Sequence, residues 1–164
     1  MNCPRAIAAT AIGLALFLSL VDVPAAQDLS PQALRAYSFV DVHPAQGDLA
    51  ALLTTHALSA AKAGRKPFAY LKAKWCGPCL KLAESLNDPA MIDAFRGTAI
   101  VGMDLDEWAG RLVKVGLPED QAIPAFYRLD ENGRPTTARI DGGAWGADIP
   151  KNMAPPLKAY FHKN

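Results

Sequence analysis

The chain has 164 residues, of which 51% are hydrophobic and 20% are charged. This composition is typical of a single soluble globular domain and excludes the collagen-like and the charge-rich disordered classes of protein. The formal net charge is only +1, so no large positive surface is available for a phosphate backbone, and nucleic acid is not an expected partner.

An uncharged apolar run extends from residue 6 to residue 21, directly after Arg5. It is shorter than the ~20 residues that a membrane-spanning helix needs, and Val23 and Ala25 form the small-residue pair that signal peptidase accepts. We therefore predict a signal peptide over residues 1–25 and a mature protein in the periplasm or outside the cell, which meets the membrane only through this export signal. An uncleaved membrane anchor is the alternative.

Residues 26–65 are predicted to form an N-terminal extension of the domain that contains helical and strand segments. A serine followed by a proline predicts a short helix over residues 30–37. A short strand is predicted at residues 39–42. Asp48 then caps a longer helix, whose apolar residues recur at a spacing of three and four until Gly64.

Residues 66–164 are predicted to form the main domain, in which strands and helices alternate. Predicted strands at residues 68–71 and 99–103 are separated by two helical segments, the second of which begins at Asp88. This order implies parallel pairing of the two strands through a crossover connection. A turn signal then predicts an antiparallel hairpin. The later elements are a helix over about residues 109–115, strands at residues 125–129 and 136–140 around the turn at 130–133, and a last helix over about residues 152–161.

The segment KWCGPC, residues 74–79, places two cysteines two residues apart directly after a predicted strand. Cys3 lies in the predicted signal, so these two would be the only cysteines of the mature chain. If the segment turns into a helix, Cys76 and Cys79 can reach disulfide geometry, and Pro78 suits the first helical turn. The helix N-terminus would lower the pKa of the Cys76 thiol. We expect a reachable thiolate at Cys76 and a sheltered, resolving thiol at Cys79.

A structural disulfide and a metal site are the two alternatives to a redox role for the cysteine pair. A structural disulfide across so short a loop would remove little entropy from the unfolded chain, so that role predicts a longer spacing. A zinc or copper site would need further ligands, and His43, His56 and His162 do not stand at ligand spacing from the pair. We expect no metal and no bound cofactor other than the redox-active cysteine pair itself.

The segment WCGPC after an apolar strand, with Ile123-Pro124 ahead of a later strand and hairpin, resembles the thioredoxin superfamily. The resemblance covers about residues 66–161. It implies an α/β thioredoxin-like fold, with a central mixed β-sheet flanked by helices on both faces. Lys66-Pro67 before the strand and NDPAM at residues 87–91 are similar to exported thioredoxin-like domains, including the periplasmic C-terminal domain of the membrane disulfide reductase family.

The resemblance also implies roles for the site residues. Cys76 would be the attacking thiol and Cys79 the resolving thiol, and Pro124 would be a cis-proline that faces them. The backbone of Ile123 would then bind an extended substrate segment, as a strand binds at a sheet edge. The substrate-binding residues implied in this way are Trp75, Gly77, Pro78, Ile123 and Pro124.

Two departures from the superfamily pattern concern proton transfer at Cys79. Thioredoxin has a buried acid in the strand before the cysteines, and Tyr70 stands at the corresponding position here. A basic partner in the next strand is also missing, because Gly102 falls at about that place. Another route for the proton, through water or Glu84, would be needed.

We therefore predict an exported thiol:disulfide oxidoreductase that acts as a monomer on protein disulfides. Gly77-Pro78 between the cysteines resembles the reducing branch of the superfamily, which favours a protein disulfide reductase supplied with electrons by a membrane partner. The alternative is a non-catalytic thioredoxin-like binding module for a periplasmic partner. Loss of the acid at Tyr70 keeps this alternative open.

Overall fold

The computed structural model describes residues 29–119 and 122–163. The predicted signal peptide, residues 1–25, lies outside the described residues. Within the described ranges, none of the helices combines the length and the apolar character that crossing a bilayer requires.

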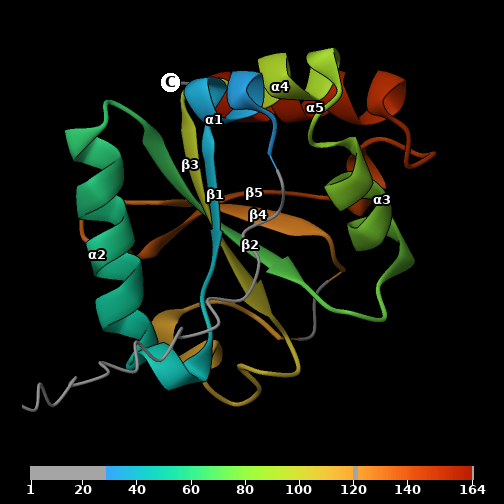
Figure 1. The fold of residues 1–164 in the computed structure, drawn as a ribbon. Coiled ribbons are helices and arrows are strands. Elements are labelled where there is room, and N and C mark those ends of the chain that lie inside the picture. The colour runs from blue at the N-terminus through green and yellow to red at the C-terminus, as the bar shows by residue number, and fades with distance from the viewer. Residues whose placement is uncertain (1–28, 120–121, 164) are drawn as a thin grey trace, which may run out of the picture.

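A mixed β-sheet forms the centre of the fold (Figure 1). The strands are β1 (Ser38–Asp41), β2 (Lys66–Lys72), β3 (Thr98–Asp104), β4 (Ala125–Leu129) and β5 (Pro135–Asp141), in the spatial order β1-β3-β2-β4-β5. Strands β1 and β2 both run parallel to β3, whereas β4 is antiparallel to β2 and to β5. The predicted parallel crossover and the predicted hairpin are both confirmed.

Helices pack against both faces of this sheet. The α-helices are α1 (Pro31–Ala36), α2 (Leu49–Lys62), α3 (Gly77–Ser85), α4 (Pro89–Phe95) and α5 (Pro150–His162). Helix α2 packs on one face, and α1, α3, α4 and α5 pack on the other (Figure 1). Ser30, Asp48 and Asp88 cap α1, α2 and α4 through their side-chain oxygens, at the positions where the sequence predicted helix starts.

Alternation along the strands divides the buried core into two halves, because successive side chains of a strand point to opposite faces. The half beneath α4 and α5 is a cluster of aromatic rings with Phe126 at its centre. The ring centroid of Phe126 lies 4.6 Å from that of Tyr70, 5.2 Å from Phe161 and 5.7 Å from Phe95. This cluster joins β2, β4, α4 and α5.

The other half of the core is closed by Trp108, which lies in the connection after β3. Its side chain is fully buried among residues of α2 and the sheet, and its indole N–H donates a hydrogen bond to the carbonyl of Val42 at 2.9 Å. A side chain that is both apolar and hydrogen-bonded fixes the path of this connection.

The prediction of a helix over residues 109–115 is wrong. This segment consists of turns and one short 3-10 helix, η2 (Val113–Val115). Gly110 and Gly116 have φ angles of 72° and 84°, and a residue in this left-handed region cannot continue an α-helix. The apolar spacing that suggested a helix places Leu112 and other apolar side chains in the core instead.

Candidate active site

The two cysteines lie where β2 leads into α3, and the local sequence explains this geometry. Cys76 is the N-cap of α3, and its sulfur accepts a hydrogen bond from the backbone N–H of Cys79 at 3.2 Å. Pro78 lies in the first turn, where the missing N–H of proline leaves no donor unpaired. The predicted position of Cys76 at the start of a helix is therefore confirmed.

Cys76 and Cys79 form a disulfide, with their Cα atoms 5.2 Å apart. In this state the two residues are only 4% and 3% exposed, because Ala73 and Ile123 pack against them. The sequence predicted a reachable sulfur at Cys76, and the disulfide form does not present one. The lowered pKa of the Cys76 thiol stays a prediction for the reduced protein, since a disulfide sulfur does not titrate.

Exposed side chains surround the disulfide on its outer side. Trp75 is 67% exposed, and its indole N–H donates to a carboxylate oxygen of Asp106 at 2.9 Å. Gly77 and Pro78 are also exposed. The Ile123–Pro124 peptide bond is cis, as the resemblance implied, and Ile123 lies against the cysteine pair. The structure thus brings together all five residues predicted to bind substrate, and their binding role stays a prediction.

An ion-pair cluster links the loop between β2 and α3, which leads to the cysteines, to the connections that follow β1 and β3. One oxygen of Glu107 accepts from the ammonium of Lys74 at 2.8 Å, and the other lies 2.6 Å from Nδ1 of His43. The hydrogen bond from Lys74 and that from His43 lower the pKa of the Glu107 carboxyl. The sequence did not predict this cluster, because the three residues come from connections after three different strands and share no local motif.

Replacing Glu107 with glutamine is expected to lower the free energy of unfolding at neutral pH by about 0.2–1 kcal/mol, the range for exposed ion pairs. The folded-state pKa of Glu107 is depressed, so its contribution is present above the ordinary glutamate value and is lost as the pH falls through the folded-state pKa. Urea unfolding should therefore show a difference in unfolding free energy between the two proteins that is largest at neutral pH and shrinks as the pH is lowered below the ordinary glutamate value.

Glu84→Gln is the matched control, because Glu84 pairs with Lys81 on the exposed surface of α3, away from this cluster. If the difference in unfolding free energy between Glu107→Gln and the unaltered protein stayed the same at low pH, it would not arise from the ionised Glu107 carboxylate.

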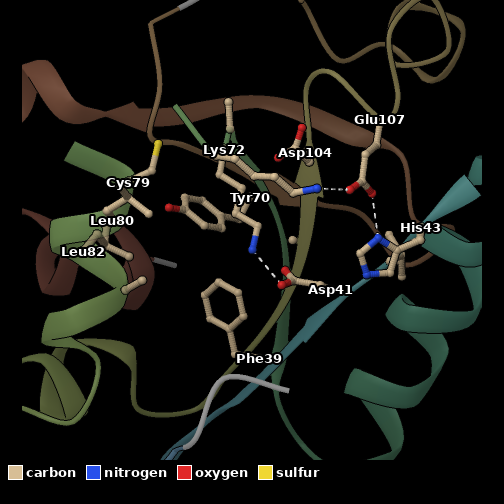
Figure 2. A pocket seen from close by; sticks show the side chains of 15 residues that line it. Phe39, Asp41, His43, Tyr70, Lys72, Cys79, Leu80, Leu82, Asp104 and Glu107 are labelled. Carbon is tan, nitrogen blue, oxygen red and sulfur yellow. Dashed lines mark hydrogen bonds and ion pairs between the residues drawn. The ribbon is translucent and has the colours of Figure 1, made fainter. Parts of the chain in front are cut away.

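A cavity of about 160 Å³ lies beneath α3 and extends over the adjacent face of the sheet (Figure 2). Cys79 is among the described residues that line it, whereas Cys76 is not. Strands β1, β2 and β3 contribute Asp41, Tyr70 and Gly102. The cavity therefore reaches Cys79 but not Cys76.

The polar centre of this cavity is an ion pair between Asp41 and Lys72, 2.6 Å apart. The register places Asp41 of β1 opposite Gly102 of β3, and Gly102 opposite Tyr70 of β2. A Cβ atom on Gly102 would overlap with Oδ1 of Asp41. The missing side chain of Gly102 is therefore what allows the Asp41 carboxylate to extend across β3 toward β2.

An acid and a base, Asp41 and Lys72, thus line the same cavity as Tyr70 and Gly102. Glu84, which was considered as a proton route, does not line the cavity and is exposed beside Lys81. A proton route through Glu84 stays a prediction. Lys72 follows Tyr70 by two residues and shares its face of the strand, which is a signal in the sequence. The pairing of Asp41 with Lys72 could be predicted only if the order of the strands were known.

Two of the histidines considered as metal ligands have other partners, since His43 pairs with Glu107 and His56 with a backbone carbonyl. His56 donates to the carbonyl of Ala99 at 3.0 Å, and burial lowers its pKa. In the part of the chain that the structure describes, no group of three or more histidine, cysteine, aspartate or glutamate residues is placed to hold a metal ion.

No family model and no curated protein matches the chain. Solved structures similar to it include a disulphide isomerase from Xylella fastidiosa, which is 18% identical, with 70% of this chain and 89% of that chain covered and a TM-score of 0.53. Two thioredoxins are also similar. The one from Nicotiana alata is 20% identical over 77% of this chain and 95% of its own, with a TM-score of 0.48, and the one from Trichomonas vaginalis is 24% identical over 63% and 84%, with a TM-score of 0.43. The fold of the chain is thioredoxin-like.

Proposed function

We propose that this chain, on its thioredoxin-like fold, is a thiol:disulfide oxidoreductase. The observation that carries the proposal is the Cys76–Cys79 disulfide at the N-terminus of α3, with the cis peptide bond at Ile123–Pro124 beside it. A disulfide between residues so close in sequence removes little entropy from the unfolded chain, so stabilisation does not account well for it. A pair that opens and closes during a reaction accounts for it better.

The reaction starts from the reduced pair. The Cys76 thiolate attacks one sulfur of a substrate disulfide, which breaks, and the other substrate sulfur leaves as a thiolate and takes up a proton. Cys79 then loses its proton and attacks Cys76, closing the Cys76–Cys79 disulfide and releasing the second substrate sulfur. Two electrons pass from the cysteine pair to the substrate.

The position of Cys76 favours the first step. Its sulfur already accepts the N–H of Cys79, and the unpaired N–H groups and positive dipole of the helix N-terminus stabilise a thiolate at this point. Trp75, Gly77 and Pro78 form the exposed rim, and the backbone of Ile123, ahead of the cis bond to Pro124, would bind an extended substrate segment.

The finer part of the proposal is an exported reductase of protein disulfides that receives electrons from a membrane partner. The signal-like residues 1–25 support export, and Gly77-Pro78 between the cysteines supports the reducing direction. The pair itself serves as the redox centre, and no other cofactor is needed for the reaction as written.

Reduction of insulin in the presence of dithiothreitol tests the proposal. The purified protein is expected to accelerate the precipitation of the insulin B chain well above the rate with dithiothreitol alone, because the Cys76 thiolate is the better nucleophile at neutral pH. A rate equal to that of dithiothreitol alone would favour the alternative, a thioredoxin-like module that binds a partner without catalysis.

A further inference from the structure

The backbone of Ile123 is the part of the site whose position depends on residues outside it. Ile123 lies against the Cys76–Cys79 pair, and among the residues that the structure describes no hydrogen bond involves its own N–H or carbonyl. Those two groups are therefore the ones that remain for pairing with an extended substrate segment. How they are presented depends on the contacts that fix the chain on either side of Ile123.

The segment after β5 borders Ile123 on one side. The backbone N–H of Gly142 donates to the carbonyl of Pro124 at 3.0 Å. A Cβ atom on Gly142 would lie 3.3 Å from Cδ of Pro124 and 3.8 Å from the carbonyl oxygen of Ile123, so the two segments are in close contact. The N–H of Gly143 in turn donates to Oδ1 of Asp141 at 2.8 Å. The Asp141 carboxylate therefore fixes the segment that borders the Ile123 carbonyl.

Arg139 of β5 fixes the chain on the other side of Ile123. Its Nη2 atom donates to the carbonyl of Ala122, the residue directly before Ile123, at 3.3 Å. The same atom lies 2.7 Å from Oδ2 of Asp141, and a guanidinium nitrogen of this kind carries two hydrogens, one for each acceptor. The ion pair, which we call the Arg139–Asp141 bridge, thus joins the residue before Ile123 to the segment after β5.

The sheet holds the Arg139–Asp141 bridge in place. The two side chains are only 27% and 24% exposed, so solvent screens this ion pair less than a fully exposed one. Arg139 lies opposite Tyr127 in the register of β4 and β5, and its guanidinium carbon lies 5.8 Å from the centre of the Tyr127 ring. Side chains on strands are positioned more precisely than those on loops. The bridge is therefore a fixed support for two segments that lie outside the strands.

We propose that the Arg139–Asp141 bridge positions the backbone of Ile123 for an extended protein substrate, with Arg139 as a positioning residue. This inference rests on the proposed function, because the substrate must pair with this backbone while Cys76 attacks its disulfide. The bridge acts through the carbonyl of Ala122 and through the segment after β5, and it takes no part in the thiol chemistry. Its loss weakens the binding of a protein substrate and leaves the reactivity of the cysteines as it was.

Arg139→Met tests the proposal, because methionine keeps a long unbranched side chain and removes both contacts of the guanidinium. Insulin reduction is measured with dithiothreitol in fixed excess while the insulin concentration is varied. The KM for insulin is expected to rise about three- to tenfold, the range that corresponds to weakening one or two backbone hydrogen bonds. The kcat is expected to change by less than about twofold. Partial unfolding would give the opposite result, a lower kcat with the KM unchanged.

A small disulfide separates substrate positioning from thiol chemistry. Dithionitrobenzoate has no peptide backbone to pair with Ile123, so its rate constant with the reduced protein should differ by less than about twofold between Arg139→Met and the unaltered protein. Arg128→Met is the matched control. The Arg128 guanidinium also donates to a backbone carbonyl at 3.3 Å, that of Lys163, and Arg128 lies toward the end of β4 that is remote from Ile123. This control should behave as the unaltered protein with both disulfides.

Asp141→Asn is the second variant, because it keeps the size of the side chain and removes the charge that holds Arg139. It should raise the KM for insulin in the same way, and it decides the matter if Arg139→Met shows no cooperative unfolding. An unchanged KM in a folded Arg139→Met would overturn the proposal, as would an equal slowing with insulin and with dithionitrobenzoate. Failure of the proposed function is a separate result: the unaltered protein would not accelerate insulin reduction at all, and this inference would fall with it.

Discussion

Cys76→Ser is expected to reduce the insulin-reductase rate to that of dithiothreitol alone, a loss of at least about a hundredfold. A serine hydroxyl in place of the thiol cannot form the disulfide with substrate on which both steps depend. Cys79→Ala is expected to give a different result, because it keeps the first attack and removes the thiol that resolves it. The insulin rate should also fall, while a covalent Cys76–substrate adduct accumulates.

The measurement that separates the two variants is non-reducing electrophoresis of proteins captured in cells. Cys79→Ala should carry adducts that dithiothreitol releases, and the double variant Cys76→Ser, Cys79→Ala should carry none. This comparison also tests access to Cys76, which is only 4% exposed in the disulfide form. Full insulin activity in Cys76→Ser, or adducts that persist in the double variant, would show that the chemistry does not pass through Cys76.

The parts of this fold that could be predicted from sequence are those with local signals. The helix caps at Ser30, Asp48 and Asp88 each act within three residues, so their patterns identify the starts of α1, α2 and α4. The position of Cys76 at the start of α3 follows from a strand that ends just before it and a proline in the first turn.

The features that the sequence did not predict depend on strand order or on backbone conformation. The pairing of Asp41 with Lys72 needs β1 to lie next to β3, and it needs glycine at position 102 between them. Nothing local to any one of these residues indicates the other two. The loss of the predicted helix at residues 109–115 depends on the left-handed φ angle of Gly110, and glycine alone in a sequence does not fix the sign of φ.

Tyr70 takes part both in the aromatic core and in the lining of the cavity. The Tyr70 ring stacks on Phe126 at 4.6 Å and belongs to the apolar half of the core, while its hydroxyl lies in the cavity. A carboxylate lines the same cavity from β1, on the far side of β3, at Asp41. One face of β2 therefore carries both a ring that packs in the core, that of Tyr70, and a charged side chain, that of Lys72.

Phe126→Ala is expected to have the largest effect on stability, with a loss of about 3–5 kcal/mol in the free energy of unfolding. Phe126 is fully buried and its ring contacts Tyr70, Phe95 and Phe161, so truncation leaves a cavity between β2, β4, α4 and α5 that no neighbouring backbone can fill. Domains of this size are stable by only about 5–15 kcal/mol, so about a fifth or more of the total would be lost. This loss in unfolding free energy can be measured by urea unfolding monitored by circular dichroism.

Two variants bracket the Phe126 result. Phe126→Leu keeps most of the buried volume and is expected to cost clearly less than the alanine variant, because the cost scales with the size of the void. Trp75→Ala removes a larger ring, but one that is 67% exposed, and should change the unfolding free energy by no more than about 0.5 kcal/mol. If Phe126→Ala cost no more than Trp75→Ala, the aromatic cluster would not be the main support of the sheet.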